Sequence, residues 1–424
     1  MTFMKLRHLA DIQNSNVDKL ISDEEIPVRL CNYVDVYKND FITPDLAFNP
    51  GSATQAEIGR FHVKVGDVII TKDSEDRHDI GIPAYVRETA DDLVCGYHLT
   101  MLRAFKNRAV GSFLFWALQS KPAREAFAIA ANGVTRYGLT QEGIRGLTLW
   151  TPDLSEQKRI TTFLDCETQR IDAMIAKKEK LISLLNQRLE SCREELLWGG
   201  GATTKLGHHI AILPGYAFSS TGFSEDPEDV RLLRGANVGV DETRWDETVY
   251  WPKSEITGLE RFALSAGDIV MGMDRPWISG GIRVAMITEA DLPCLLLQRV
   301  CKITPKRSLD ANYLKAILES KRFLAYFEPI MTGVSVPHIS GDQIANFRFP
   351  FIEREEQKRR IDQLVQDTQS TLPMNRATQA SIDRLREYRA ALITAAVTGQ
   401  IDVETYCKTG KASAKLDRIE EMAD

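Results

Sequence analysis

Two loops of this chain are rich in side chains that donate and accept hydrogen bonds, and each follows a short β-type run. The first loop carries Lys72, Asp73, Ser74 and Arg77, and the second carries Asp274, Arg275, Trp277 and Ser279. Polar side chains on loops beside a rigid sheet can bind the edges of nucleic-acid bases, which present donors and acceptors in the grooves. A solvated hairpin would have the same composition, so both interpretations stay open at this point.

Three further segments have the same polar character. One is a glycine-containing loop that carries Asn132, Thr135, Arg136 and Tyr137 in the first half, and Thr332, Ser335 and His338 in the second. Its glycines would let the backbone approach a phosphate closely, although simple helix termination also explains them. Another is a strand entry with Tyr97 and His98, matched by Gln298 and Arg299, where a buried histidine or a surface ion pair is the alternative. The last is a polar and aromatic stretch with Tyr216, Ser219, Ser220, Arg234 and Asn237.

Other residues that could do chemistry have simpler explanations. His208 and His209 are adjacent, so their side chains point apart, and no further metal ligands are spaced nearby. Asp67 and Asp268 stand at equivalent strand starts, where a carboxylate after glycine caps a turn. The sequence contains no phosphate-binding loop, dinucleotide-binding turn, amino-methyltransferase motif, H-E-x-x-H or G-x-S-x-G. We therefore expect a non-catalytic protein that itself binds no metal and no cofactor.

The composition predicts a soluble globular protein of two or three domains, with 424 residues, 43% hydrophobic residues and a mean hydropathy of -0.23. We expect neither secretion nor a membrane partner, because no long apolar run and no basic-then-apolar leader occur. Seven scattered cysteines without a C-x-x-C pair indicate reduced thiols in the cytoplasm. The net charge of -6 argues against a nucleic-acid binder that acts alone, so other subunits would have to supply phosphate contacts.

The elements that must position these residues occur twice. Residues 65–69 (VGDVI) recur as 266–270 (AGDIV), an offset of 201. Three more pairs recur at an offset of 200, namely 118–121 (LQSK) with 318–321 (LESK), 132–135 (NGVT) with 332–335 (TGVS), and 156–159 with 356–359 (both EQKR). The chain is therefore an internal duplication.

Each half has the same predicted order of elements. Short β-type runs such as residues 67–71 and 282–287 precede one amphipathic helix, at 112 to about 130 and at 311 to about 327. A glycine loop, a short strand with a proline-bearing turn (147–152 and 347–351) and a long polar helix follow. The long helices, at about 155–197 and about 355–397, each carry one apolar stripe that is typical of helix pairing. We expect Ser155 to cap the first, and Pro373 to kink or restart the second.

These observations predict an α+β chain with two similar α/β domains separated by two long helices. Its parts are residues 1–152, the first helix 153–200, the second domain 201–352, the second helix 353–400 and a tail 401–424. Two helices of about 40 residues are about 60 Å long each and most economically pair antiparallel as a coiled coil. Such a pseudo-two-fold molecule suits a duplex that is read in successive major grooves about 34 Å apart.

This layout resembles the specificity subunit of type I restriction–modification enzymes over nearly the whole chain. Residues 152–160 (PDLSEQKRI) and 351–359 (FIEREEQKR) are similar to that family's entries into its conserved helical regions, and 392–400 (LITAAVTGQ) is similar to the end of the second. The resemblance implies two target-recognition domains, each reading one half of an interrupted sequence in double-stranded DNA. It also implies that the helices set the half-site spacing and dock two methyltransferase subunits, which carry S-adenosylmethionine. Nuclease-translocase subunits, which need ATP and Mg for restriction, would join for cleavage.

Other functions predict different patterns. A nuclease built from a duplicated domain would repeat a carboxylate–lysine cluster, and the sequence has none. A coiled-coil scaffold without DNA contact would diverge evenly, whereas the polar loops here differ while their flanks match. A specificity protein of a fused or type IIB-like modification system would show the same duplication and is kept as the alternative.

Overall fold

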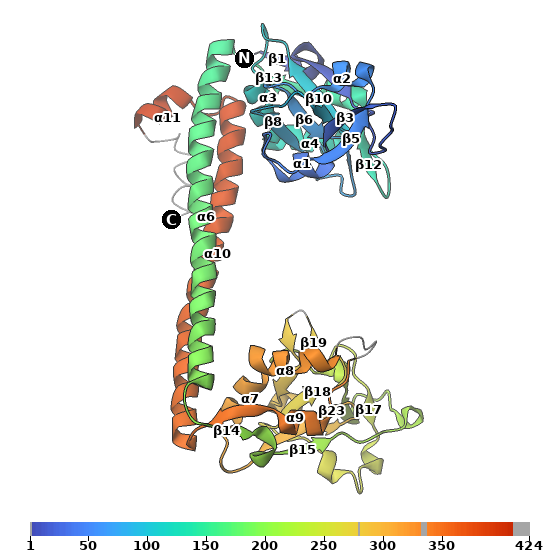
Figure 1. Cartoon of the computed structure of the whole chain (residues 1–424), viewed down its shortest axis with the longest axis vertical. Helices are drawn as coiled ribbons and strands as arrows, with labels where there is room; N and C mark the ends of the chain where they lie inside the picture. The colour runs from blue at the N-terminus through green and yellow to red at the C-terminus, as the bar shows by residue number, and fades with distance from the viewer. Residues whose placement is uncertain (1, 279, 332–336, 410–424) are drawn as a thin grey trace. The chain divides into compact units, whose positions relative to one another are not determined.

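The computed structural model describes residues 2–278, 280–331 and 337–409 (Figure 1). The chain forms two compact units, Met1–Ile182 with Arg376–Asp424, and Ser183–Asn375. Each long helix contributes to both units. None of the helices in the described part combines the length and apolar character needed to span a membrane.

The first unit contains a five-stranded sheet in the order β2-β10-β6-β8-β4. Its strands are β2 (Ala10–Asn14), β10 (Leu99–Ala104), β6 (Val68–Thr71), β8 (Pro83–Val86) and β4 (Phe41–Ile42). All neighbours are antiparallel except β4 and β8. Two-stranded pairing of β1 (Phe3–Lys5) with β13 (Thr148–Trp150) ties the start of this domain to its end.

Both faces of this sheet are covered by other elements. Because successive side chains of a strand point to opposite sides, neighbouring residues of β6 pack with different elements. Ile69 of β6 packs with a smaller sheet of β5 (Asn49–Ala53), β3 (Ile26–Cys31) and β9 (Leu93–Cys95). Val68 and Ile70 pack instead with helices α3 (Gly111–Gln119) and α4 (Lys121–Ala130). The central strand therefore lies between two hydrophobic clusters, which explains why all four of its residues are buried.

The second unit repeats this architecture. Its main sheet has the order β15-β23-β18-β21, with β15 (Ile210–Pro214), β23 (Val300–Pro305), β18 (Ile269–Gly272) and β21 (Val284–Met286). Val270 packs toward the small sheet of β17 (Tyr250–Trp251), β16 (Val230–Leu233) and β22 (Cys294–Leu296). Ile269 and Met271 pack toward α7 (Ala311–Leu318) and α8 (Lys321–Met331). The predicted pair of similar α/β domains is confirmed.

The prediction of one amphipathic helix before the glycine loop of each domain was wrong, because two helices occupy that segment, α3 and α4 in the first domain and α7 and α8 in the second. The backbone of Ser120 between α3 and α4 is extended, with φ -63° and ψ 148°, and its hydroxyl donates to the carbonyl of Ala117 at 2.6 Å. Ser320 repeats this bond to Ile317 at 2.7 Å. A serine that bonds to its own preceding turn competes with helix continuation, and Pro122 reinforces the break in the first domain.

The long helices are α6 (Leu154–Trp198) and α10 (Arg354–Val397), and they pair antiparallel as predicted (Figure 1). In the first unit early residues of α6, such as Ile171, pack with late residues of α10, such as Ile382 and Leu385. In the second unit Leu197, near the end of α6, packs with Ile361, near the start of α10. The apolar stripe read from the sequence is thus the seam between the helices.

One expectation about these helices was wrong, and for the other, that Pro373 would kink or restart the second helix, only the restart is excluded. The carboxylate of Asp153, and not Ser155, caps α6, because it accepts hydrogen bonds from the backbone amides of Ser155 and Glu156 at 2.9 Å each. Helix α10 runs through Pro373 without restarting. Pro373 is exposed, so water can reach the carbonyl that loses its helical partner there.

The tail after α10 contains a further helix, α11 (Val403–Thr409), which lies against α6 and α10 in the first unit. The ring of Tyr406 meets that of Phe163 edge-on with centroids 4.9 Å apart, and its hydroxyl lies 3.0 Å from that of Tyr388. Val403 and Tyr406 are buried. The first part of the predicted tail is therefore folded, and residues 410–424 lie outside the described residues.

Candidate nucleic-acid interface

Three of the predicted loops meet at one place in the first unit. The segment after β6 forms β7 (Asp73–Ser74), which pairs with β12 (Tyr137–Leu139) of the glycine loop. The same segment meets the strand entry before β10, because the amide of Lys72 donates to the carbonyl of His98 at 2.9 Å. Backbone hydrogen bonds therefore bring together segments that lie far apart in the sequence.

A carboxylate–imidazole pair stands at this meeting point. Asp73 Oδ2 lies 2.6 Å from His98 Nδ1, and the two side chains are 20% and 32% exposed. The backbone of His98 has a φ of 66°, in the left-handed region that favours glycine. The ring of Tyr97 lies beside that of His98, with centroids 4.0 Å apart.

The second unit has the same backbone arrangement. The amide of Met273 donates to the carbonyl of Arg299, and the amide of Ile339 donates to the carbonyl of Met273, both at 2.9 Å. They match two bonds of the first unit, from the amide of Lys72 to the carbonyl of His98 at 2.9 Å and from the amide of Leu139 to the carbonyl of Lys72 at 2.8 Å. Asp274 also forms an isolated antiparallel bridge with His338, at the position where the first unit has β7 and β12.

Asp274 occupies the position of Asp73 and has two side-chain partners. Its carboxylate lies 2.7 Å from Arg299 Nη1 and 2.5 Å from His338 Nδ1. Burial alone would raise the pKa of Asp274, but hydrogen bonds and charge from His338 and Arg299 outweigh burial and lower it. Arg299 has a φ of 68°, like its counterpart His98.

Most of the other predicted residues of these loops are exposed. Those in the described part of the chain with exposed side chains are Asn132, Thr135, Arg136, Arg275, Gln298 and His338, whereas Lys72, Tyr137 and Trp277 are half-buried. Two residues bind the scaffold instead. Ser74 is buried, and the guanidinium of Arg77 donates to the carbonyl of Ala128 at 2.9 and 3.3 Å. Ser279, Thr332 and Ser335 lie outside the described residues.

The polar and aromatic stretch of the second domain divides into two parts. Ser219 and Tyr216 are exposed, and the carbonyl of Tyr216 accepts from the amide of Gln298 at 2.8 Å. Asn237 is buried and donates to the carbonyl of Arg244 at 2.8 Å, and Arg234 donates to the carbonyl of Glu247. Asn237 and Arg234 therefore hold the domain together, while Tyr216 and Ser219 adjoin the strand entry.

The structure reveals the first-domain counterpart of this stretch, which sequence comparison did not find. The amide of Tyr97 donates to the carbonyl of Val17 at 2.8 Å, as the amide of Gln298 does to Tyr216. The ammonium of Lys19 lies over the ring of Tyr97, 5.7 Å from its centroid, and Lys19 is exposed. No sequence signal marked Lys19, because the pairing that places it spans about 80 residues.

The two turn carboxylates cap their turns as predicted. Asp67 accepts from the amide of Lys64 at 2.9 Å, and Asp268 accepts from the amide of Ser265 at 2.9 Å. Asp67 is also 1% exposed and accepts two hydrogen bonds, at 2.8 and 2.7 Å, from Arg103 on the central sheet. A third carboxylate, Asp291, accepts from the side chains of Thr243, Thr288 and Trp245. Burial alone would raise the pKa of Asp291, but these bonds lower it to about 2.

The adjacent histidines take structural roles. His209 Nδ1 lies 2.9 Å from the hydroxyl of Ser308, and its ring stacks on Phe351 with centroids 4.4 Å apart. Burial, followed by the neighbouring His208 and Lys306, lowers the pKa of His209. Within residues 2–278, 280–331 and 337–409, no group of three or more His, Cys, Asp or Glu side chains could hold a metal ion.

A buried glutamine joins each domain to the long helix that follows it. Gln157, in the first turn of α6, is fully buried; its Oε1 accepts from the amide of Val110 at 2.9 Å, and its Nε2 donates to the carbonyls of Arg108 and Pro152 at 3.2 and 2.9 Å. Gln357, its counterpart on α10, makes the same three bonds, to Asp310, Ser308 and Ile352, at 2.7, 3.0 and 2.8 Å. The repeated EQKR motif is therefore the joint between domain and helix.

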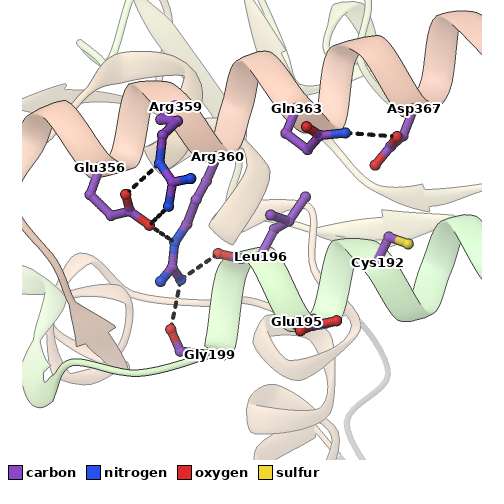
Figure 2. A pocket seen from close by; sticks show the side chains of 9 residues that line it. All are labelled: Cys192, Glu195, Leu196, Gly199, Glu356, Arg359, Arg360, Gln363 and Asp367. Carbon is purple, nitrogen blue, oxygen red and sulfur yellow. Dashed lines mark hydrogen bonds and ion pairs between the residues drawn. The ribbon is translucent and has the colours of Figure 1, made fainter.

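The second unit has a polar groove of about 500 Å³ where the end of α6 meets the start of α10 (Figure 2). Arg360 Nη1 donates to the carbonyls of Leu196 and Gly199 at 2.9 and 2.7 Å, which satisfies the end of α6. Hydrogen bonds from Arg359 and Arg360 lower the pKa of Glu356 to about 2. The groove's best-placed charges bind one another and the helix end, so we assign it to the helix joint.

Comparisons with known sequences found two curated relatives, while no family model matches the chain. Over 166 residues it is 39% identical to the type I restriction enzyme EcoAI specificity subunit of Escherichia coli; the match covers 38% of this chain and 28% of that protein. Over 311 residues it is 24% identical to the type I restriction enzyme MjaVIII specificity subunit of Methanocaldococcus jannaschii, covering 69% of this chain and 70% of that protein.

Two solved structures share the fold at 16% sequence identity. One comes from a study of complex assembly and conformational transition in the type I R-M system; it has a TM-score of 0.69 and covers 94% of this chain and 97% of its own. The other is the HsdS subunit from Thermoanaerobacter tengcongensis, with a TM-score of 0.56 and coverage of 94% and 96%. The arrangement of two domains and two long helices is thus shared over nearly the full length.

Proposed function

Because this chain is similar in sequence and in fold to type I restriction–modification specificity subunits, we propose that it selects the DNA sequence on which such a complex acts. One observation carries the proposal: each domain joins three polar loops by the same backbone hydrogen bonds, yet the loops carry different side chains. His98 stands where the other domain has Arg299, and Tyr97 where it has Gln298. Two domains with the same loop backbone but different hydrogen-bonding side chains are suited to bind two different half-sites.

The chain would not catalyse a reaction itself in this function. Two methyltransferase subunits would bind S-adenosylmethionine, and nuclease-translocase subunits would use ATP and Mg when the complex cleaves. The net charge of -6 supports this division of labour, because a DNA-bound complex needs lysines and arginines to neutralise phosphates. Beside the buried Gln157 and Gln357, the exposed Lys158 and Arg159 recur as Lys358 and Arg359, which would give two partner copies related charged positions to meet.

A domain exchange tests the proposal. Residues 201–350 are replaced by the equivalent segment of a relative with a different target, and the hybrid is co-expressed with its methyltransferase partner. We expect sequencing of the methylated sites to show one changed half-site and one unchanged half-site. The reciprocal exchange of residues 1–150 serves as the control and should change the other half-site. An unchanged methylation pattern in both hybrids would overturn the proposal.

Shortening the helices tests whether they set the spacing. Removing seven residues, two turns, from each of α6 and α10 shortens each helix by about 10 Å. That length corresponds to about three base pairs of DNA at about 3.4 Å each. We expect a shorter spacer between the same half-sites or a loss of binding, and an unaltered spacer would exclude the role of the helices as a ruler.

A further inference from the structure

The same carboxylate clamp occurs once in each domain. Asp73 holds His98, and Asp274 holds Arg299, at 2.6 and 2.7 Å. Asp274 and Arg299 each lie 201 residues after their counterparts Asp73 and His98. The clamp, meaning the aspartate and the side chain that it binds, is therefore part of the internal duplication. The acid is the same in both domains, whereas the clamped side chain differs.

The clamped residues also share an uncommon backbone conformation. His98 and Arg299 have φ values of 66° and 68°, although neither is glycine. Residues other than glycine adopt this left-handed backbone conformation where the surrounding structure holds them in it, and such residues are frequent at binding sites. Here the enforcing structure is the backbone bond from Lys72 to the carbonyl of His98, and from Met273 to the carbonyl of Arg299.

Each clamp uses only one nitrogen of the side chain that it holds. Asp73 is bound by His98 Nδ1, and Asp274 by Arg299 Nη1. In the described part of the chain, His98 Nε2 and Arg299 Nη2 have no hydrogen-bond partner. The side chain of Arg299 is 67% exposed and that of His98 is 32% exposed. Each domain therefore presents a fixed nitrogen with unused hydrogen-bonding capacity from the same place.

We propose that His98 and Arg299 are matched base readers, and that Asp73 and Asp274 are positioning residues which aim them. This inference rests on the proposed function and names the residues that would decide the sequence. A guanidinium is matched to the O6 and N7 acceptors of guanine, so Arg299 would read a guanine in the half-site of the second domain. The imidazole of His98 has one free nitrogen, Nε2, and cannot form the paired hydrogen bonds of a guanidinium. The first domain would therefore bind a different base at the equivalent position.

The carboxylates themselves are poor candidates for the contact with DNA. An ionised carboxylate only accepts hydrogen bonds. Both oxygens of Asp274 already face a partner, and Asp73 Oδ2 already faces His98. A carboxylate would also be repelled by nearby phosphates. Asp73, which the sequence placed among the base readers, is therefore assigned the positioning role.

The test uses the complex of the full chain with its methyltransferase subunits and a DNA library with randomised half-sites. For Arg299→Gln we expect the preference for guanine at one position of one half-site to fall about 10-fold or more, with all other positions unchanged. Arg307→Gln, at an exposed arginine of the same domain, makes the same change of charge and should leave the preference unaltered. Asp73→Asn should alter only the other half-site.

A double-mutant comparison separates positioning from a general structural effect. Asp274→Asn alone should weaken the preference at the same position as Arg299→Gln, and adding it to Arg299→Gln should change that preference no further. If Arg299→Gln and Arg299→Lys lower methylation of every sequence equally, Arg299 contacts phosphate and the inference is overturned. If the unaltered complex selects no sequence, the proposed function fails and the inference falls with it. Selection that survives in Arg299→Gln unchanged overturns the inference alone.

Discussion

Replacing Gln157 should loosen the first domain from α6 by an amount that the structure allows to be estimated. Leucine has a similar volume but no polar atoms, so the amide of Val110 and the carbonyls of Arg108 and Pro152 would lose their side-chain partner. A buried backbone group left without a partner costs about 1–3 kcal/mol. Three fully buried groups would cost about 3–9 kcal/mol, and because these three bonds are only partly buried we expect Gln157→Leu to be destabilising by roughly 3–6 kcal/mol.

Gln157→Glu separates shape from hydrogen bonding. Glutamate keeps an acceptor for the amide of Val110, but its second oxygen would face two carbonyls that also only accept. We expect a loss similar to that of the leucine variant at neutral pH. The glutamate variant should recover as the pH falls, because a protonated carboxyl group can donate to one of the carbonyls.

Hydrogen exchange measured peptide by peptide is the assay, because it reports on each unit separately. A loss of about 3 kcal/mol corresponds to roughly 150-fold faster exchange of the protected amides in α3 and β13. Gln357→Leu is the matched control and should accelerate exchange in the second domain only. Wild-type protection in Gln157→Glu at neutral pH would refute the reasoning, since the donor bonds would then contribute nothing.

Three further predictions follow from buried groups. Asp67→Ala should cost about 3 kcal/mol, because the Asp67 side chain is 2% exposed and its loss leaves Arg103 without a partner. Asp268→Ala should cost about 1 kcal/mol, because the Asp268 side chain is 18% exposed. Hydrogen exchange of the central strands measures both. Asp291 has a folded pKa of about 2, below its ordinary 3.8. It therefore contributes about 2 kcal/mol to the free energy of unfolding above about pH 4, and this contribution is lost as the pH falls through 2. In Asp291→Asn the stability of the second unit should depend less on pH between 4 and 2, as measured by acid unfolding. Ending the chain after residue 400 should destabilise the first unit by about 3 kcal/mol or more by uncovering Phe163, and an unchanged melting temperature would contradict the packing role of α11.

The sequence predicted the features that periodicity and duplication encode. The apolar stripe on each long helix and the repeated Gly-Asp strand depend on residues within one or two turns of one another. The helix break at Ser120 was missed because a hydroxyl that bonds to its own backbone leaves no trace in the apolar pattern. The cap of α6 was placed two residues late for a similar reason, since Asp153 and Ser155 are both good caps and only the geometry distinguishes them.

The candidate site was only partly visible from the sequence, because long-range pairing decides which polar residues face outward. Arg77 has the composition of a base reader, yet its guanidinium binds the end of α4. Lys19 was missed because its neighbour Tyr97 lies on another segment of the chain. Gln157 showed itself only as one letter of a repeated motif, and its three backbone partners come from two other segments.

The helix α11 makes the two ends of the duplication chemically unlike. In the first unit it packs against Phe163, which is 4% exposed and shares an apolar cluster with Ile160, 1% exposed. The corresponding residues of the second unit are Gln363 and Arg360 at the polar groove. A partner protein that binds at both positions would find an apolar surface covered by α11 in the first unit and an open, charged groove in the second. Two copies of one partner that met these places would therefore make unlike contacts at the two ends of the duplication.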